Sequence, residues 1–293
     1  MYAITGATGN TGKGITSTLL AAGKEVRIIS RDAEKAKELT DKGAELFQGS
    51  TDDVELLKKT FDGATAVYAM LPFNMQAEDY TAFQQKHSSA IAEAMAACKV
   101  KYVVSLSSQG AHLESGSGVV LGLHNMEQSF NRIEGLNTLH LRPGYFMENT
   151  LGMVGLIKEA GIMGSPIKGD LSMPVIATKD IADYAAKRLL ALDFKGHNFQ
   201  DLLGARNETY FEMAKVCGGS IGKKDLNYVE FAYEDFKSAF MGMGASESVA
   251  DNMNEFIERL NAGEVFILER NIENTTSTTI EEFVHTFSYV YNM

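Results

Sequence analysis

The 293-residue sequence has few cysteines, no long apolar run and no excess of positive charge. Two cysteines, Cys98 and Cys217, are too few for a disulfide framework and fit a reducing compartment. No stretch reaches the 18 or so apolar residues that a transmembrane helix needs, and no charged leader with an apolar core precedes the first predicted strand. We therefore expect a cytoplasmic protein without a membrane anchor or a secretion signal.

Positive charge is scarce in one region above all. The formal net charge is −11, and residues 225–293 contribute −10 of it, with 13 Asp or Glu against 3 Lys or Arg. Such a balance argues against nucleic-acid binding through phosphate contacts. The acidic region is either a solvated helical face or a surface for a partner protein.

Several catalytic motifs are also missing. The six histidines and two cysteines show no metal-ligand spacing, so we expect no metal site. There is no G-x-S-x-G nucleophile elbow, and the Lys13-Gly14-Ile15 order breaks the phosphate-binding pattern of nucleoside triphosphatases. These absences argue against serine hydrolases, metalloenzymes and nucleoside triphosphatases.

A glycine-rich turn is the strongest motif that is present. It reads Gly6-x-x-Gly9-x-x-Gly12, between an extended run at 2–4 and a helical run at 15–22. Strand, glycine turn and helix N-terminus together form the pyrophosphate site of dinucleotide-binding folds. We expect the turn to bind a dinucleotide through Gly6, Thr8, Gly9, Asn10, Thr11 and Gly12.

The end of the second predicted strand indicates which dinucleotide binds. Arg31 follows Gly12 by 19 residues, where an acidic residue would select a ribose hydroxyl and an arginine a 2′-phosphate. Ser30 adds a hydroxyl and Lys35 a second cation, while Asp32 is placed to cap the next helix. The sequence therefore predicts NADP(H) in preference to NAD(H).

Strands and helices alternate through the first half of the chain. Strands are predicted at 2–4, 26–30, 44–48, 64–71, 101–107 and 138–141, and helices at 15–22, 33–41, 52–61, 78–98 and 123–133. This order predicts an α/β fold with a Rossmann-type, doubly wound parallel sheet over residues 1–150.

The alternation is weaker after residue 150. Helices are predicted at 151–159, 180–192, 210–217, 234–241, 247–261 and 280–291, a strand at 197–203 and a loop at 161–169. We expect residues 151–293 to form a smaller, mostly helical substrate lobe, interleaved with the core in a single structural unit.

Ligands of such sheets bind at the carboxyl ends of the strands. The candidates there are Leu71, Pro72 and Asn74 after the fourth strand, Ser107, Ser108 and Gln109 after the fifth, and Pro143 and Tyr145 after the sixth. Asn74 or Gln109 is placed to reach a ribose or the nicotinamide amide.

Seven segments in this order carry a family resemblance: TGATGNTGKG, SRDAEKA, STDDVELL, SLSSQGA, LRPGYFMEN, DIADYAAKRLLAL and TTIEEFVHTF. The chain resembles the NmrA-like group of atypical short-chain dehydrogenases/reductases. That group includes NADPH-dependent quinone oxidoreductases, triphenylmethane-type reductases and regulators that sense the cofactor. The resemblance implies NADP(H) binding and a small quinone-like substrate, and it leaves a homodimer open.

The sequence departs from the wider dehydrogenase pattern at the catalytic Tyr and Lys. Those positions fall on Val120 and His124. A quinone accepts hydride with little acid help, so His124, Ser107 and Ser108 are the candidate catalytic residues. His124 is equally well explained as a histidine without a role at a helix start. Two functions remain: a reductase that transfers hydride from NADPH to a quinone or other flat electrophile, and a non-catalytic NADP(H) sensor that binds a protein partner.

Overall fold

A seven-stranded parallel sheet forms the centre of the protein. The computed structural model describes residues 1–293. The strands lie in the order β10-β6-β5-β4-β1-β2-β3, so the direction of winding reverses between β1 and β4. Their bounds are Tyr2–Ile4 (β1), Val26–Ser30 (β2), Glu45–Gln48 (β3), Ala66–Ala69 (β4), Tyr102–Leu106 (β5), Asn137–Pro143 (β6) and His197–Leu202 (β10). The predicted doubly wound α/β fold is confirmed, and its switch point lies beside the glycine turn.

Helices cover both faces of this sheet. On one face lie α1 (Asn10–Ala21), α2 (Ala33–Asp41) and α7 (Thr178–Ala191), which share an apolar core with β1 and β2. On the other face lie α3 (Val54–Phe61), α4 (Tyr80–Ala97) and α5 (Leu121–Asn131), whose core includes Phe61, Ile91 and Phe130. A short 3₁₀ helix, η1 (Gly118–Val120), leads into α5.

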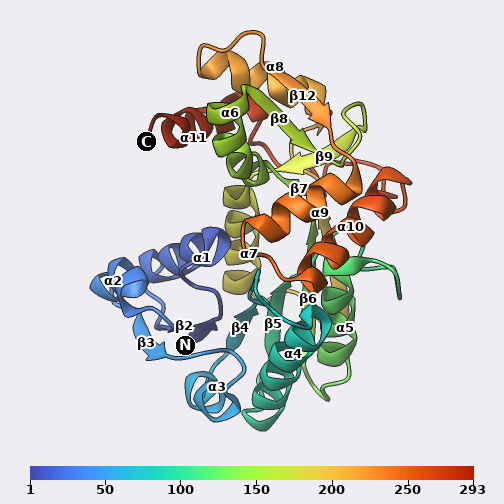
Figure 1. Cartoon of the computed structure of the whole chain (residues 1–293). Coiled ribbons are helices and arrows are strands. Elements are labelled where there is room, and N and C mark those ends of the chain that lie inside the picture. Colours follow the sequence, from blue (N-terminus) through green and yellow to red (C-terminus); the bar gives the residue numbers. More distant parts are fainter.

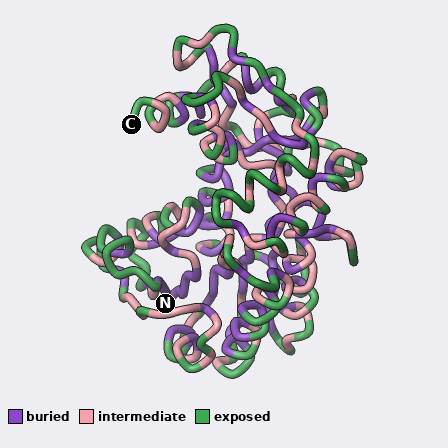
Figure 2. The backbone as a smooth tube through the Cα atoms, viewed as in Figure 1, coloured by how far each residue is buried: buried purple, intermediate pink, exposed green.

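The C-terminal lobe has a core of its own. Its helices are η2 (Met147–Met153), α6 (Val154–Ala160), α8 (Tyr210–Ser220), α9 (Tyr233–Gly242), α10 (Glu247–Asn261) and α11 (Ile280–Asn292). Figure 1 shows α6, α8, α11 and β12 at the end of the molecule away from α3 and α4. Buried segments recur in this lobe and in the sheet (Figure 2), so the lobe adds a third hydrophobic core to the two that flank the sheet. Because α7 and β10 come from the later half of the sequence yet belong to the sheet layer, the two halves are interleaved.

Two small sheets within the lobe were not predicted. One joins β7 (Tyr145–Phe146), β9 (Met173–Ile176) and β11 (Asn207–Glu208); the other joins β8 (Ile162–Ser165) and β12 (Asn227–Glu230). The prediction of a loop at 161–169 is wrong, because β8 pairs in parallel with β12. Strands of two to four residues are too short to show an alternating pattern, so only the partner strand reveals them.

Candidate cofactor and substrate site

The turn between β1 and α1 requires glycine at two positions. Gly6 adopts a φ of +63°, the left-handed region that side chains disfavour. A Cβ on Gly12 would lie 2.2 Å from the Gly6 carbonyl oxygen, so the first turn of α1 can approach the preceding loop only without a side chain. Gly9 is the N-cap of α1, and neither a side-chain cap nor an acidic residue occupies the first turn. The N–H groups at this helix start are therefore available to an anion.

The polar residues of the turn have different roles. Thr8 lines the pocket in front of the turn, and Asn10 is exposed at the start of α1. Thr11 is buried and accepts a hydrogen bond of 3.0 Å from the Tyr68 hydroxyl, which ties α1 to β4. The Thr11 side chain thus supports the turn, and its backbone is the part left for a ligand.

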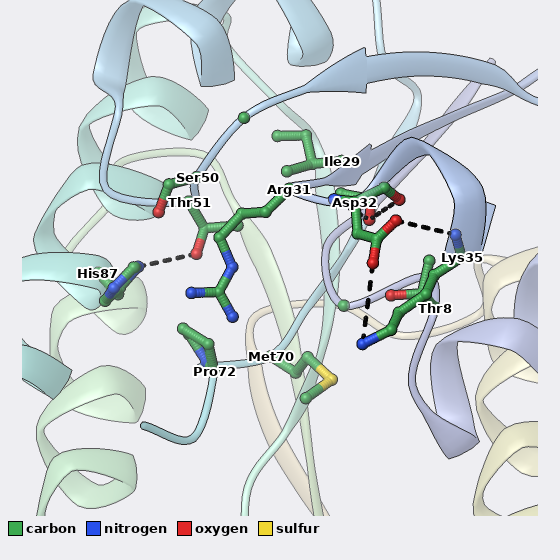
Figure 3. A pocket seen from close by; sticks show the side chains of 13 residues that line it. Thr8, Ile29, Arg31, Asp32, Lys35, Ser50, Thr51, Met70, Pro72 and His87 are labelled. Carbon is green, nitrogen blue, oxygen red and sulfur yellow. Dashed lines mark hydrogen bonds and ion pairs between the residues drawn. The ribbon is translucent and has the colours of Figure 1, made fainter. Parts of the chain in front are cut away.

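A pocket lies between this turn and the carboxyl ends of β2, β3 and β4. Its lining residues are Gly6, Thr8, Ile29, Ser30, Arg31, Asp32, Lys35, Gly49, Ser50, Thr51, Met70, Pro72 and His87. Figure 3 shows the Arg31 side chain in the middle of this pocket, between the Thr51–His87 pair and Met70. No carboxylate lies within ion-pair distance of Arg31, the residue after β2, whereas Arg27 on β2 pairs with Glu45. The pocket therefore offers one unpaired guanidinium.

The neighbours of Arg31 shape the turn after β2. The Asp32 carboxylate accepts a 3.1 Å hydrogen bond from the Lys35 N–H, which confirms that Asp32 caps α2. Its other oxygen lies 3.9 Å from the Lys35 ammonium. The Ser30 hydroxyl accepts from the Asp32 N–H and donates to the Asp32 carbonyl. Ser30 is thus already hydrogen-bonded, and Arg31 and Lys35 are the groups that can meet an anion.

The far side of the pocket contains residues that the sequence analysis did not single out. Thr51 Oγ1 lies 2.8 Å from His87 Nδ1, and both side chains are buried. Burial lowers the pKa of His87, although the nearby Asp52 carboxylate opposes the shift, so the ring is neutral at pH 7. Thr51 follows β3 and could have been found by the strand-end rule. His87 could not, because its helical spacing is the same as that of core residues.

A second group of predicted residues lies at the ends of β5 and β6, outside this pocket. The Ser107 hydroxyl donates to Glu127 Oε1 at 2.5 Å, and the Glu127 carboxylate also accepts two hydrogen bonds from Arg142, at 2.9 and 2.5 Å. Ser107 and Glu127 are each 2% exposed. The Ser107 hydroxyl is committed to this buried network, whereas the Ser108 hydroxyl makes no hydrogen bond to the protein.

His124 lies in the first turn of α5, with Nδ1 2.9 Å from the Ala111 carbonyl oxygen. A carbonyl only accepts, so Nδ1 carries the hydrogen and Nε2 is the atom available to a ligand. The Tyr145 hydroxyl lies 2.7 Å from that of Tyr210, so Tyr145 joins the lobe core. The Gln109 amide nitrogen donates to the Arg142 carbonyl and to the Asp201 carboxylate, so it has both hydrogens engaged within the protein and is not free for a ligand.

The structure therefore divides the predicted residues into two sets. Gly6, Thr8, Ser30, Arg31 and Pro72 share one pocket. The remaining ones lie elsewhere. Leu71 is buried after β4, Ser107 and Ser108 follow β5, and His124 lies in the first turn of α5; Pro143 is the last residue of β6 and Tyr145 the first of β7. No group of three or more His, Cys, Asp or Glu side chains is arranged to hold a metal ion. No helix has both the length and the apolar character to cross a membrane.

Known proteins of similar sequence and structure include reductases and a regulator. An NAD(P)H azoreductase of Xenophilus azovorans is 28% identical over 257 residues, covering 87% of this chain and 85% of the relative. The NADPH-dependent quinone oxidoreductase of Escherichia coli, solved with NADPH, superposes with a TM-score of 0.81 at 22% identity, covering 98% and 99% of the two chains. NmrA, a negative transcriptional regulator solved with NADP, has a TM-score of 0.70 at 14% identity, covering 97% and 90%.

The structural likeness confirms the Rossmann-type fold at identities too low to transfer a substrate. The model of the NmrA-like family matches residues 2–290, which is nearly the whole length. The resemblance found in the sequence motifs is confirmed, and the chain belongs to the NmrA-like family.

Proposed function

We propose that this protein is an NADPH-dependent reductase that transfers hydride to a quinone or another small, flat electrophile. The observation that carries the proposal is the unpaired Arg31 guanidinium in the pocket that also contains the glycine turn. A dinucleotide with a 2′-phosphate presents two anionic groups, and these two features match them.

The residues at the site fit NADPH at each part of the molecule. The uncapped N-terminus of α1 and the close Gly6–Gly12 approach suit the pyrophosphate. Arg31, with Lys35 nearby, suits the 2′-phosphate. The ends of β5 and β6 suit the nicotinamide, because they lie across the switch point from β2.

NADPH supplies the hydride when it is bound, and the chain orients the reactants and handles the proton. A quinone that gains hydride becomes a phenolate, which needs little acid assistance. His124 is the proposed proton donor, through Nε2 in its protonated form, because Nδ1 is held by the Ala111 carbonyl. The free Ser108 hydroxyl is the proposed donor of a hydrogen bond to the substrate oxygen.

The names of the relatives support reduction of planar, electron-poor molecules. One reduces azo compounds by name and another is named for quinones. A panel of quinones and azo dyes, with NADPH oxidation followed at 340 nm, tests the proposal. Because the phenolate needs little acid assistance, a His124→Gln variant should lower kcat by roughly 10²-fold at most, the lower end of the range for a general acid, with little change in NADPH binding.

The alternative is a cofactor sensor without catalysis. It is favoured by Val120 and His124 at the family's Tyr and Lys positions and by the similar fold of a transcriptional regulator solved with NADP. The two functions differ in one measurement. Tight NADPH binding without turnover of any compound in the panel would refute the reductase and leave the sensor.

A further inference from the structure

A second pocket lies at the opposite edge of the sheet from Arg31. It lies beyond the end of β10, between Gln109, which follows β5, and the segment 264–279 that precedes α11. Four of the nine lining residues are apolar, and the other five are polar or charged. The apolar ones are Pro174, Leu203, Phe266 and Leu268; the others are Gln109, Ser172, Asn207, Glu269 and Arg270. None of the residues that line the first pocket lines this one. Gln109 lines it, but its amide nitrogen is held by the Arg142 carbonyl and Asp201 and is not free for a nicotinamide.

Arg270 supplies the positive charge of this second pocket. Its guanidinium donates to the carbonyl oxygens of Leu203, at 2.9 Å, and Gly204, and to Asn207 Oδ1 at 2.8 Å. No carboxylate lies within ion-pair distance of it, and burial lowers its pKa without any opposing acid. A guanidinium has five N–H donors, so two of them lack an acceptor in the protein.

The segment that carries Arg270 has other attachments. The Leu203 N–H donates to the Asn274 carbonyl at 2.7 Å, and the Thr276 N–H donates to the Gly204 carbonyl at 3.2 Å. These backbone bonds join the segment to the residues after β10 without help from a charge. A neutral side chain at position 270 would be enough to anchor this segment. A half-buried cation without a counter-ion costs free energy, unless a ligand supplies the negative charge.

The composition of the walls limits the class of ligand. A single guanidinium beside apolar and neutral polar side chains suits a monoanion with a flat body, whose apolar face Phe266 and Pro174 can cover. A dianion such as phosphate would leave excess negative charge beside Glu269, the one acid in the lining. We infer that this pocket binds a small aromatic carboxylate, with the carboxylate on Arg270.

Direct binding tests the inference without NADPH or turnover, so the result is independent of the proposed reductase function. The probe is 2-naphthoate, and 2-naphthamide is its neutral match, both titrated calorimetrically into the full chain. We expect 2-naphthoate to bind at least tenfold more tightly than the amide. Arg270→Gln should remove that difference and leave amide binding unchanged, and Arg31→Ala should change neither.

Two further variants keep Arg270 and its carbonyl contacts in place. Leu268→Asp adds an acid at an exposed wall position and should weaken 2-naphthoate binding at least threefold. Glu269→Gln removes the rim acid and should strengthen it about twofold, the scale of a solvent-exposed charge interaction. Equal affinity for acid and amide, loss of binding in Arg31→Ala, or unchanged binding in both Arg270→Gln and Leu268→Asp would overturn the inference.

Discussion

The Arg31→Ala substitution tests the cofactor assignment most directly. The Arg31 side chain points into the first pocket and makes no ion pair within the protein. Its removal therefore leaves no buried charge without a partner. We expect the free energy of unfolding to change by less than about 0.5 kcal/mol, as at other exposed positions. Any effect on cofactor affinity would then report the missing contact with the ligand and not a disturbed fold.

The size of the effect follows from the contact that is lost. A hydrogen bond to a charged group contributes roughly 1.5–3 kcal/mol, which corresponds to a ~10- to 150-fold rise in the Kd for NADPH. Arg31 is exposed and the Lys35 ammonium stays nearby, so we expect the lower half of that range. The Kd for NADH should stay almost unchanged, because NADH has no 2′-phosphate.

Titration of both cofactors, followed by the fluorescence of the reduced nicotinamide or by calorimetry, measures this difference. Lys37→Ala is the matched control, since it removes one positive charge from the exposed face of α2, where Lys37 pairs with Asp41 outside the pocket. An equal loss of NADPH and NADH affinity in Arg31→Ala would refute the assignment. So would a loss of the same size in Lys37→Ala, which would indicate an effect of net charge alone.

Three further predictions concern the scaffold. Gly12→Ala should destabilise the fold by about 1–3 kcal/mol and weaken NADPH binding, because the new Cβ would collide with the backbone of Gly6. Gly155→Ala, where a Cβ would meet open space, should instead stabilise the fold by ~0.5–1 kcal/mol. Denaturant unfolding of both variants measures the difference. Glu127→Ala should lower stability by about 3–5 kcal/mol, because it leaves the partly buried Arg142 unpaired, and an unchanged Tm would contradict this. Burial holds the pKa of His140 at about 4 against the usual 6.5, so the unfolded chain binds the proton first and stability falls as pH drops from 6.5 to 4, by about 3 kcal/mol. His140→Gln should flatten that slope, and a wild-type pH profile in the variant would refute the cause given.

The sheet was predictable from the sequence because its central strands, β1, β4 and β5, are mostly buried runs between recognisable helices. Strand β2 and helix α2 begin and end where the pattern predicts, and α10 does so too. The errors are concentrated where pairing is non-local. Strand β8 exists only because β12, more than 60 residues later, lies beside it, and neither segment alternates over enough residues to be read as a strand.

The site was predictable to the extent that a backbone rule places it. Gly6 and Arg31 line one pocket, as the strand–turn–helix pattern and the spacing predict, and their contact with the cofactor stays a prediction. The hydrogen-bond partner of a side chain follows no such rule. Ser107 was predicted to contact the cofactor or substrate, yet its hydroxyl donates to Glu127, which lies 20 residues later on α5. His87, in contrast, was not predicted as a site residue, because its helical spacing is that of a core position, yet it lines the pocket.

Packing around the missing catalytic tyrosine narrows the chemistry that is available. Val120 is 4% exposed, and a Cβ on Gly110 would lie 3.7 Å from one of its methyl groups. Just before it, a Cβ on Gly118 would lie 1.8 Å from the Asn252 carbonyl oxygen, so α10 is closed against this backbone. Val120 is thus buried in a segment that packs against α10, and a larger side chain there would require its neighbours to move. A reductase with this geometry depends on an acceptor whose reduced form is stable without a strong acid, and this favours quinones over simple ketones.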